Sequence, residues 1–175
     1  MTSTRGILIL GFGNPARGDD GLGPAFARAI ENQALPGIST IWNYQPGVEN
    51  AADIAEHATV IFVDATTSGP APYSFRRIHP RATSDFSTHI LPPESVLALA
   101  CDSLGWRGSA YLLALRGYSF ESFKEQLTPQ GDAHLRTAVE HVTTALTLDR
   151  LDSLLTDPPT EHSDSPGEPC QTSHT

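Results

Sequence analysis

The chain has 175 residues, and its 39% hydrophobic content is enough for the buried core of one domain. A formal net charge of −9 argues against a nucleic-acid partner, because binding to the phosphate backbone depends on clustered Lys and Arg. The sequence shows no stretch of roughly 20 apolar residues, no secretory signal pattern and no cysteine framework, so we expect a cytoplasmic protein without a membrane partner.

The predicted elements alternate between strand and helix. In chain order they are a strand at 7–10, a helix at 24–33, a strand at 38–44, a short helix at 49–57, a strand at 59–63 that ends on Asp64, an edge strand at 73–79, a helix around 96–100, a strand at 110–115 and a long amphipathic helix at 132–155. This alternation predicts a single-domain, doubly wound α/β fold with a mostly parallel sheet flanked by helices, either phosphorylase/hydrolase-like or flavodoxin-like. We expect this domain to cover residues 1–155. Residues 156–175 are rich in Pro, Ser, Thr and acidic residues, which predicts a disordered tail.

The glycine-rich stretch at 11–23 joins the first strand to the first helix. It begins like a dinucleotide-binding fingerprint, but Ala16 stands at the third glycine position and Pro15 removes an N–H group. A phosphate-binding loop would need Lys and Ser or Thr where Asp19 and Asp20 stand, and two carboxylates repel a phosphate. The same loop suits a divalent cation, because carboxylate oxygens bind such ions.

Asp20, Asp64 and His89 form a candidate metal-binding set. Taken singly, each type of residue has an ordinary role: Asp19 or Asp20 as a helix cap, Asp64 in a turn and His89 on a solvated loop. However, Asp64 ends a strand at the sheet edge where doubly wound folds bind ligands, and the first and third strands are commonly neighbours there. Two carboxylates that meet without a cation repel each other and raise a pKa. Joined by an imidazole, they would suit Ni, Zn, Mn or Fe.

The sequence resembles the hydrogenase maturation protease family in several separated motifs. These are Gly13-Asn14-Pro15 with Gly18-Asp19-Asp20-Gly21-Leu22-Gly23, then Val63-Asp64-Ala65, then Ser87-Thr88-His89, and finally Leu127-Thr128-Pro129, which is similar to a Leu-Ser-Pro segment of the family. The resemblance extends to about Leu148. It implies that the metal-contacting positions of the family fall on Asp20, Asp64 and His89, with Asp20 standing where many relatives have Glu.

The resemblance also implies a function, namely an endopeptidase of aspartic or metal-dependent type. Its partner would be a nickel-loaded [NiFe]-hydrogenase large-subunit precursor, from which it removes a C-terminal extension. Nickel would arrive in the bound substrate, so we expect neither permanently held nickel nor separate cofactor-binding residues. Asp20 and Asp64 would be catalytic, either by completing the coordination of nickel or as a general base. The alternatives are a metallopeptidase with its own metal, a non-cleaving nickel-dependent assembly chaperone, and a flavin or nucleotide binder.

Overall fold

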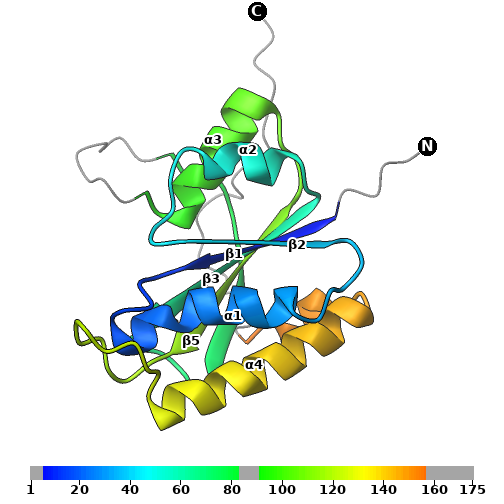
Figure 1. Cartoon of the computed structure of the whole chain (residues 1–175). Helices are drawn as coiled ribbons and strands as arrows, with labels where there is room; N and C mark the ends of the chain where they lie inside the picture. Colours follow the sequence, from blue (N-terminus) through cyan, green and yellow to red (C-terminus); the bar gives the residue numbers. More distant parts are fainter. Residues whose placement is uncertain (1–5, 83–90, 157–175) are drawn as a thin grey trace, which may run out of the picture.

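The computed structural model describes residues 6–82 and 91–156, so His89 and the predicted tail from Asp157 lie outside the described residues. The strands are β1 (Ile7–Phe12), β2 (Ile38–Asn43), β3 (Thr59–Thr66), β4 (Tyr73–Ile78) and β5 (Ser109–Arg116). The α-helices are α1 (Leu22–Glu31), α2 (Asn50–Ala55), α3 (Pro93–Leu104) and α4 (Pro129–Thr147), and the 3-10 helices are η1 (Gly18–Gly21) and η2 (Leu151–Leu154) (Figure 1).

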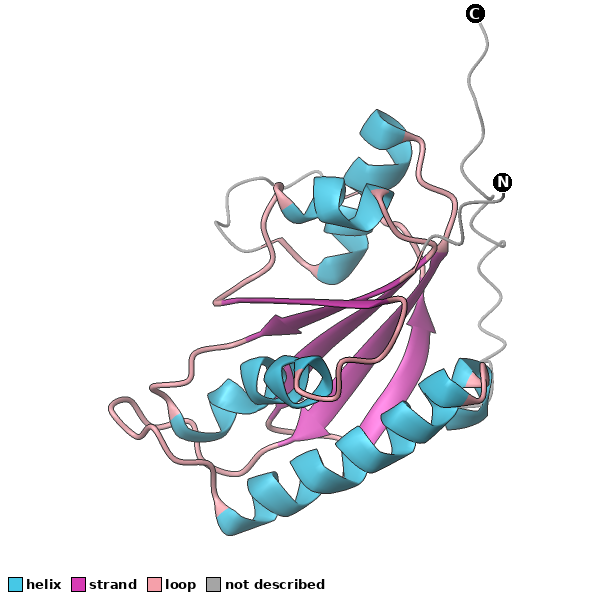
Figure 2. Ribbon diagram, turned by 45° about the vertical axis from the view of Figure 1, so that its right-hand side comes forward, coloured by secondary structure: helices cyan, strands magenta, loops and turns pink. Residues whose placement is uncertain are grey.

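The strands form one sheet in the order β2-β1-β3-β5-β4. The pairs β1–β2, β1–β3 and β3–β5 are parallel, whereas β4 pairs with β5 in the antiparallel direction and forms an edge (Figure 2). The predicted α/β fold with a mostly parallel sheet is therefore confirmed. After β1 the chain continues to β2 on one side and to β3 on the other, so the strand order reverses at β1. In such sheets the crevice for a ligand lies beyond the carboxyl ends of the strands at this reversal.

Helices cover both faces of the sheet. Figures 1 and 2 show α1 and α4 on one face and α2 and α3 on the other. The side chains of β1 alternate accordingly: Ile9 packs into the core beneath α1 and α4, whereas Leu8 and Leu10 pack into the core beneath α2 and α3. Because β1 and β3 are buried on both faces, their sequences are almost continuously apolar. Among the described ranges, no helix has the length and apolar character needed to cross a membrane.

The predicted long helix at 132–155 is wrong at both ends. It begins at Pro129, because Thr128 caps it: the Thr128 side chain accepts a hydrogen bond from the Gly131 N–H. It ends at Thr147, and Asp149 then adopts a left-handed conformation with φ of 52°. The chain turns there, and η2 follows as a separate element.

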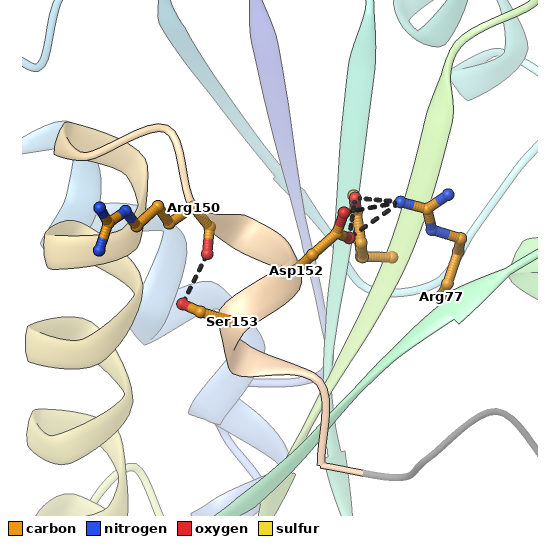
Figure 3. A network of polar contacts seen from close by, with 5 residues as sticks. Arg77, Arg150, Asp152 and Ser153 are labelled. Atoms are coloured by element: carbon orange, nitrogen blue, oxygen red, sulfur yellow. Dashed lines mark hydrogen bonds and ion pairs between the residues drawn. The ribbon is translucent and has the colours of Figure 1, made fainter.

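A polar network fastens η2 to the sheet edge (Figure 3). The Arg77 Nη2 donates to both carboxylate oxygens of Asp152 at 2.9 and 3.1 Å, and the Tyr111 hydroxyl donates to the same carboxylate at 2.8 Å. Further along, the Thr156 N–H donates to the Phe75 carbonyl at 3.0 Å. The last described residues are therefore attached to β4 and β5.

Candidate active site

The loop after β1 folds back so that Asp20 returns to the end of that strand. The Asn14 N–H donates to Asp20 Oδ2 at 3.1 Å, and the Asn14 side chain accepts from the Ala16 N–H at 2.9 Å, which closes a local turn. Gly13 has φ of 134°, and a Cβ atom there would overlap the backbone carbonyl of Asp20. Only glycine permits this return, which leaves Asp20 half-buried.

A second glycine brings the start of α1 onto the strand ends. A Cβ atom at Gly23 would overlap the Phe12 carbonyl and lie 2.6 Å from the Val63 carbonyl oxygen. These two carbonyls belong to β1 and β3 near their carboxyl ends. The missing side chain therefore lets the loop that carries Asp20 lie beside the strand that carries Asp64.

Asp64 stands near the carboxyl end of β3, which continues past the predicted end to Thr66. Its side chain reaches solvent. The protein atoms around it nevertheless displace part of the water that would hydrate the carboxylate, and this desolvation raises the pKa of Asp64. A 2.8 Å hydrogen bond from the Ala65 N–H acts in the opposite direction, and the charge of Asp20 raises the pKa further, so that it lies at about 6. The charges of Asp20 and Asp64 therefore interact.

The arrangement offers one carboxyl group whose pKa is raised to about 6, and a pair of oxygen ligands. Together, Asp20 and Asp64 have the chemistry to hold a divalent cation or to activate a water molecule. Within 6–82 and 91–156 no third His, Cys, Asp or Glu completes a metal-binding group with them. His89 falls outside these ranges, so its role as the third ligand stays a prediction.

Asp19 has a structural role that the sequence interpretation missed. Neither aspartate caps α1, contrary to the helix-cap interpretation. Instead Asp19 is fully buried and accepts hydrogen bonds from the Tyr118 N–H (2.8 Å), the Ser119 N–H (3.3 Å), the Thr128 N–H (2.7 Å) and the Thr128 hydroxyl (2.7 Å). Burial raises the pKa of Asp19, but these hydrogen bonds outweigh it and hold the pKa below its usual value.

Asp19 thereby joins two loops at the same edge of the sheet. One contains Asp20, and the other is the β5–α4 loop, residues 117–128. Backbone contacts reinforce the junction, since the Asp19 N–H donates to the Ser119 carbonyl at 2.8 Å and the Gly18 N–H donates to the Lys124 carbonyl at 2.5 Å. The Leu127-Thr128-Pro129 motif was the available signal: Thr128 both caps α4 and binds Asp19.

A cavity of about 470 Å³ lies elsewhere, near the end of β4 and the start of β5. Its lining includes Arg77, Cys101 and Trp106, and neither Asp20 nor Asp64 contributes to it. The two aspartates instead lie at the edge of the sheet where several strands end in loops.

No protein-family model and no curated protein matches the sequence. Solved structures do. A [NiFe] hydrogenase maturation protease, HycI from Thermococcus kodakarensis KOD1, has 26% sequence identity and a TM-score of 0.63, and the match covers 83% of this chain and 95% of that one. The hydrogenase maturating endopeptidase HybD from E. coli has 22% identity and a TM-score of 0.64, with 82% and 93% covered. A hydrogenase 2 maturation peptidase from Thaumarchaeota archaeon SCGC_AB-539-E09 has 23% identity and a TM-score of 0.60, with 82% and 99% covered.

The second and third of these likenesses, below 25% identity, concern the fold alone. The first also extends to sequence, although at a low level. The maturation protease from Thermococcus kodakarensis, at 26% identity, supports the family resemblance that the separated motifs predict. The other two structures share its fold.

Proposed function

We propose that this protein is a hydrogenase maturation endopeptidase that removes the C-terminal extension of a nickel-loaded [NiFe]-hydrogenase large-subunit precursor in the cytoplasm. The observation that carries the proposal is the electrostatic interaction of two carboxylates carried by β3 and by the loop after β1: the charge of Asp20 raises the pKa of Asp64. A solved structure with the same fold and 26% identity is a [NiFe] hydrogenase maturation protease, which supports the assignment.

The repulsion between the two carboxylates gives a physical reason for recognising nickel in the substrate. A pair of like charges at one site is unfavourable until a cation lies between them. A precursor that presents Ni²⁺ relieves this repulsion, whereas the metal-free precursor does not. We propose that Asp20 and Asp64 contact this substrate nickel and that His89 is the third ligand, because carboxylate and imidazole groups both bind Ni²⁺.

Asp64 is the better candidate for proton transfer. With a pKa of about 6 it is mostly ionised at neutral pH, yet it is more basic than an ordinary aspartate and so accepts a proton from an attacking water more readily. Asp20 is held in place by the Asn14 N–H and would mainly position the substrate. The chain thus supplies the base and the orientation, and the substrate supplies the metal.

The test is the intact mass of a cognate precursor before and after incubation with the protein, with and without nickel in the precursor. Loss of one C-terminal peptide from the nickel-loaded sample only is the expected result. Asp64→Asn and Asp20→Asn should abolish it, whereas Asp102→Asn, an exposed carboxylate on α3, should not. Binding without cleavage would show an assembly chaperone. Cleavage of both samples, with stoichiometric metal in the purified protein, would show a metallopeptidase with its own ion.

A further inference from the structure

The β5–α4 loop exposes two aromatic side chains beside the candidate active site. Phe123 is 96% exposed and Tyr118 is 49% exposed. Large exposed apolar side chains in the described ranges are few, and four of seven stand in the loops that leave the carboxyl ends of β2 and β5. The seven are Tyr44, Val48, Leu104, Tyr118, Phe123, Leu148 and Leu155. Exposed apolar groups that gather around a site are typical of protein-binding surfaces.

Phe123 is held in an uncommon conformation. Its φ of 65° lies in the left-handed region, which bulky side chains rarely adopt. The next residue fixes it there: the Lys124 N–H donates to the Ala16 carbonyl at 3.1 Å, and the Lys124 carbonyl accepts from the Gly18 N–H. Because Gly18 opens the η1 turn that contains Asp20, these hydrogen bonds join the backbone next to Phe123 to the turn that carries Asp20.

Tyr118 is also fixed in place. The Arg116 guanidinium lies over its ring at 5.5 Å, the His134 ring lies at 5.5 Å, and its backbone N–H is bonded to Asp19. Aromatic side chains that are ordered before binding lose little conformational entropy when a partner covers them. The residues that contribute most to protein interfaces are often such aromatic groups.

We propose that Phe123 and Tyr118 form a docking contact for the folded body of the precursor, separate from the extension that is cleaved. The partner surface is an apolar pocket next to the point where the extension leaves the substrate domain. This inference rests on the proposed function and adds how the substrate is selected. The aromatic pair lies on the loop that hydrogen bonds join to the Asp20 loop (Figure 1), so docking there would place the scissile segment over Asp20 and Asp64.

The test measures KM and kcat for cleavage of the nickel-loaded precursor and compares single variants with the native chain. Phe123→Ala and Tyr118→Ala should raise KM by about 5- to 30-fold and leave kcat within about twofold, as for loss of an interface contact. Phe123→Gly removes the ring but suits the positive φ, so it should fold at least as well as the native chain and show the same rise in KM. The matched controls are Leu104→Ala and Leu148→Ala, which remove side chains that are 51% and 57% exposed at the opposite edge of the sheet and should change nothing.

The outcomes separate this proposal from the proposed function. A native KM for Phe123→Gly and Tyr118→Ala, with cleavage still lost in Asp64→Asn, would overturn the docking contact and leave the protease assignment intact. An equal rise in KM for the control Leu104→Ala would also overturn it. Should the native chain bind the precursor without cutting it, the protease assignment fails, and the same variants decide the docking contact through the dissociation constant of the complex.

Discussion

Asp19→Asn isolates the contribution of the buried carboxylate that joins the two loops. Asparagine keeps the shape of the side chain, but it has one acceptor oxygen in place of two. Its amide nitrogen must then face at least one of the four donors that Asp19 satisfies. A buried donor without a partner costs about 1–3 kcal/mol, and the remaining bonds lose the strength that a charged acceptor gives them. We expect the free energy of unfolding to fall by about 3 kcal/mol.

In a chain of this size, 1 kcal/mol shifts the melting temperature by about 2–4 °C, so Asp19→Asn should melt about 6–12 °C below the native protein. Circular dichroism during heating measures this, and urea unfolding measures the free energy directly. The exposed control Asp102→Asn should stay within about 0.5 kcal/mol. A melting temperature of Asp19→Asn within about 2 °C of the native value would refute the structural role of Asp19.

The lowered pKa of Asp19 gives a second test of its structural role, through the pH dependence of stability. Its folded-state pKa lies below the usual value of 3.8, because the hydrogen bonds outweigh burial. A depressed pKa means that the charged form stabilises the fold above the unfolded-state pKa, and that this stabilisation is lost as the pH falls through the folded-state value. The stability difference between the native chain and Asp19→Asn should therefore be constant above about pH 5 and shrink only below about pH 4.

Three further predictions concern the edge network, the helix start and the aspartate pair. Tyr111→Phe removes the hydroxyl that donates to Asp152, so urea unfolding should show a loss of about 1 kcal/mol, and an unchanged midpoint would contradict the network. Gly23→Ala drives a methyl group into two backbone carbonyls, so the melting temperature should drop by an amount that corresponds to roughly 3 kcal/mol or more; a native melting curve would contradict that contact. Asp20→Asn removes a negative charge, so the pKa of Asp64 should fall below about 6 in a carboxyl NMR titration, and an unshifted midpoint would show that the two carboxylates do not interact.

The order of strands and helices followed from the sequence because hydrophobic periodicity reports burial locally. The apolar run before the glycine loop became a central strand, and the motif Val63-Asp64-Ala65 placed an acidic residue at the carboxyl end of its neighbour. The prediction that two carboxylates meet needed only the parallel topology. The end of α4 was harder to predict, because amphipathic spacing continues through η2 while the left-handed conformation of Asp149 depends on packing.

Contacts between loops that are distant in the sequence could not be predicted from the sequence pattern. The side chains of Asp19 and Thr128 are 109 positions apart, and no local rule connects them. The conformation of Phe123 has the same origin, since it follows from pairing between Lys124 and the loop before Asp20. Both features depend on which segments the finished sheet brings together at its carboxyl edge.

Asp19 and Asp20 show why adjacent identical residues were hard to separate by sequence reasoning. Along a 3-10 turn, successive side chains point in different directions, so one carboxylate enters the junction with Thr128 and the next faces the strand ends. The first is stabilised in its charged form by four donors, which makes it a poor base and a fixed part of the scaffold. Asp20 accepts a hydrogen bond from the Asn14 N–H, and its charge raises the pKa of Asp64. Asp19 thus fixes the turn that carries Asp20, and a substitution at either residue should act for a different physical reason: Asp19 through its junction with Thr128, and Asp20 through the charge that raises the pKa of Asp64.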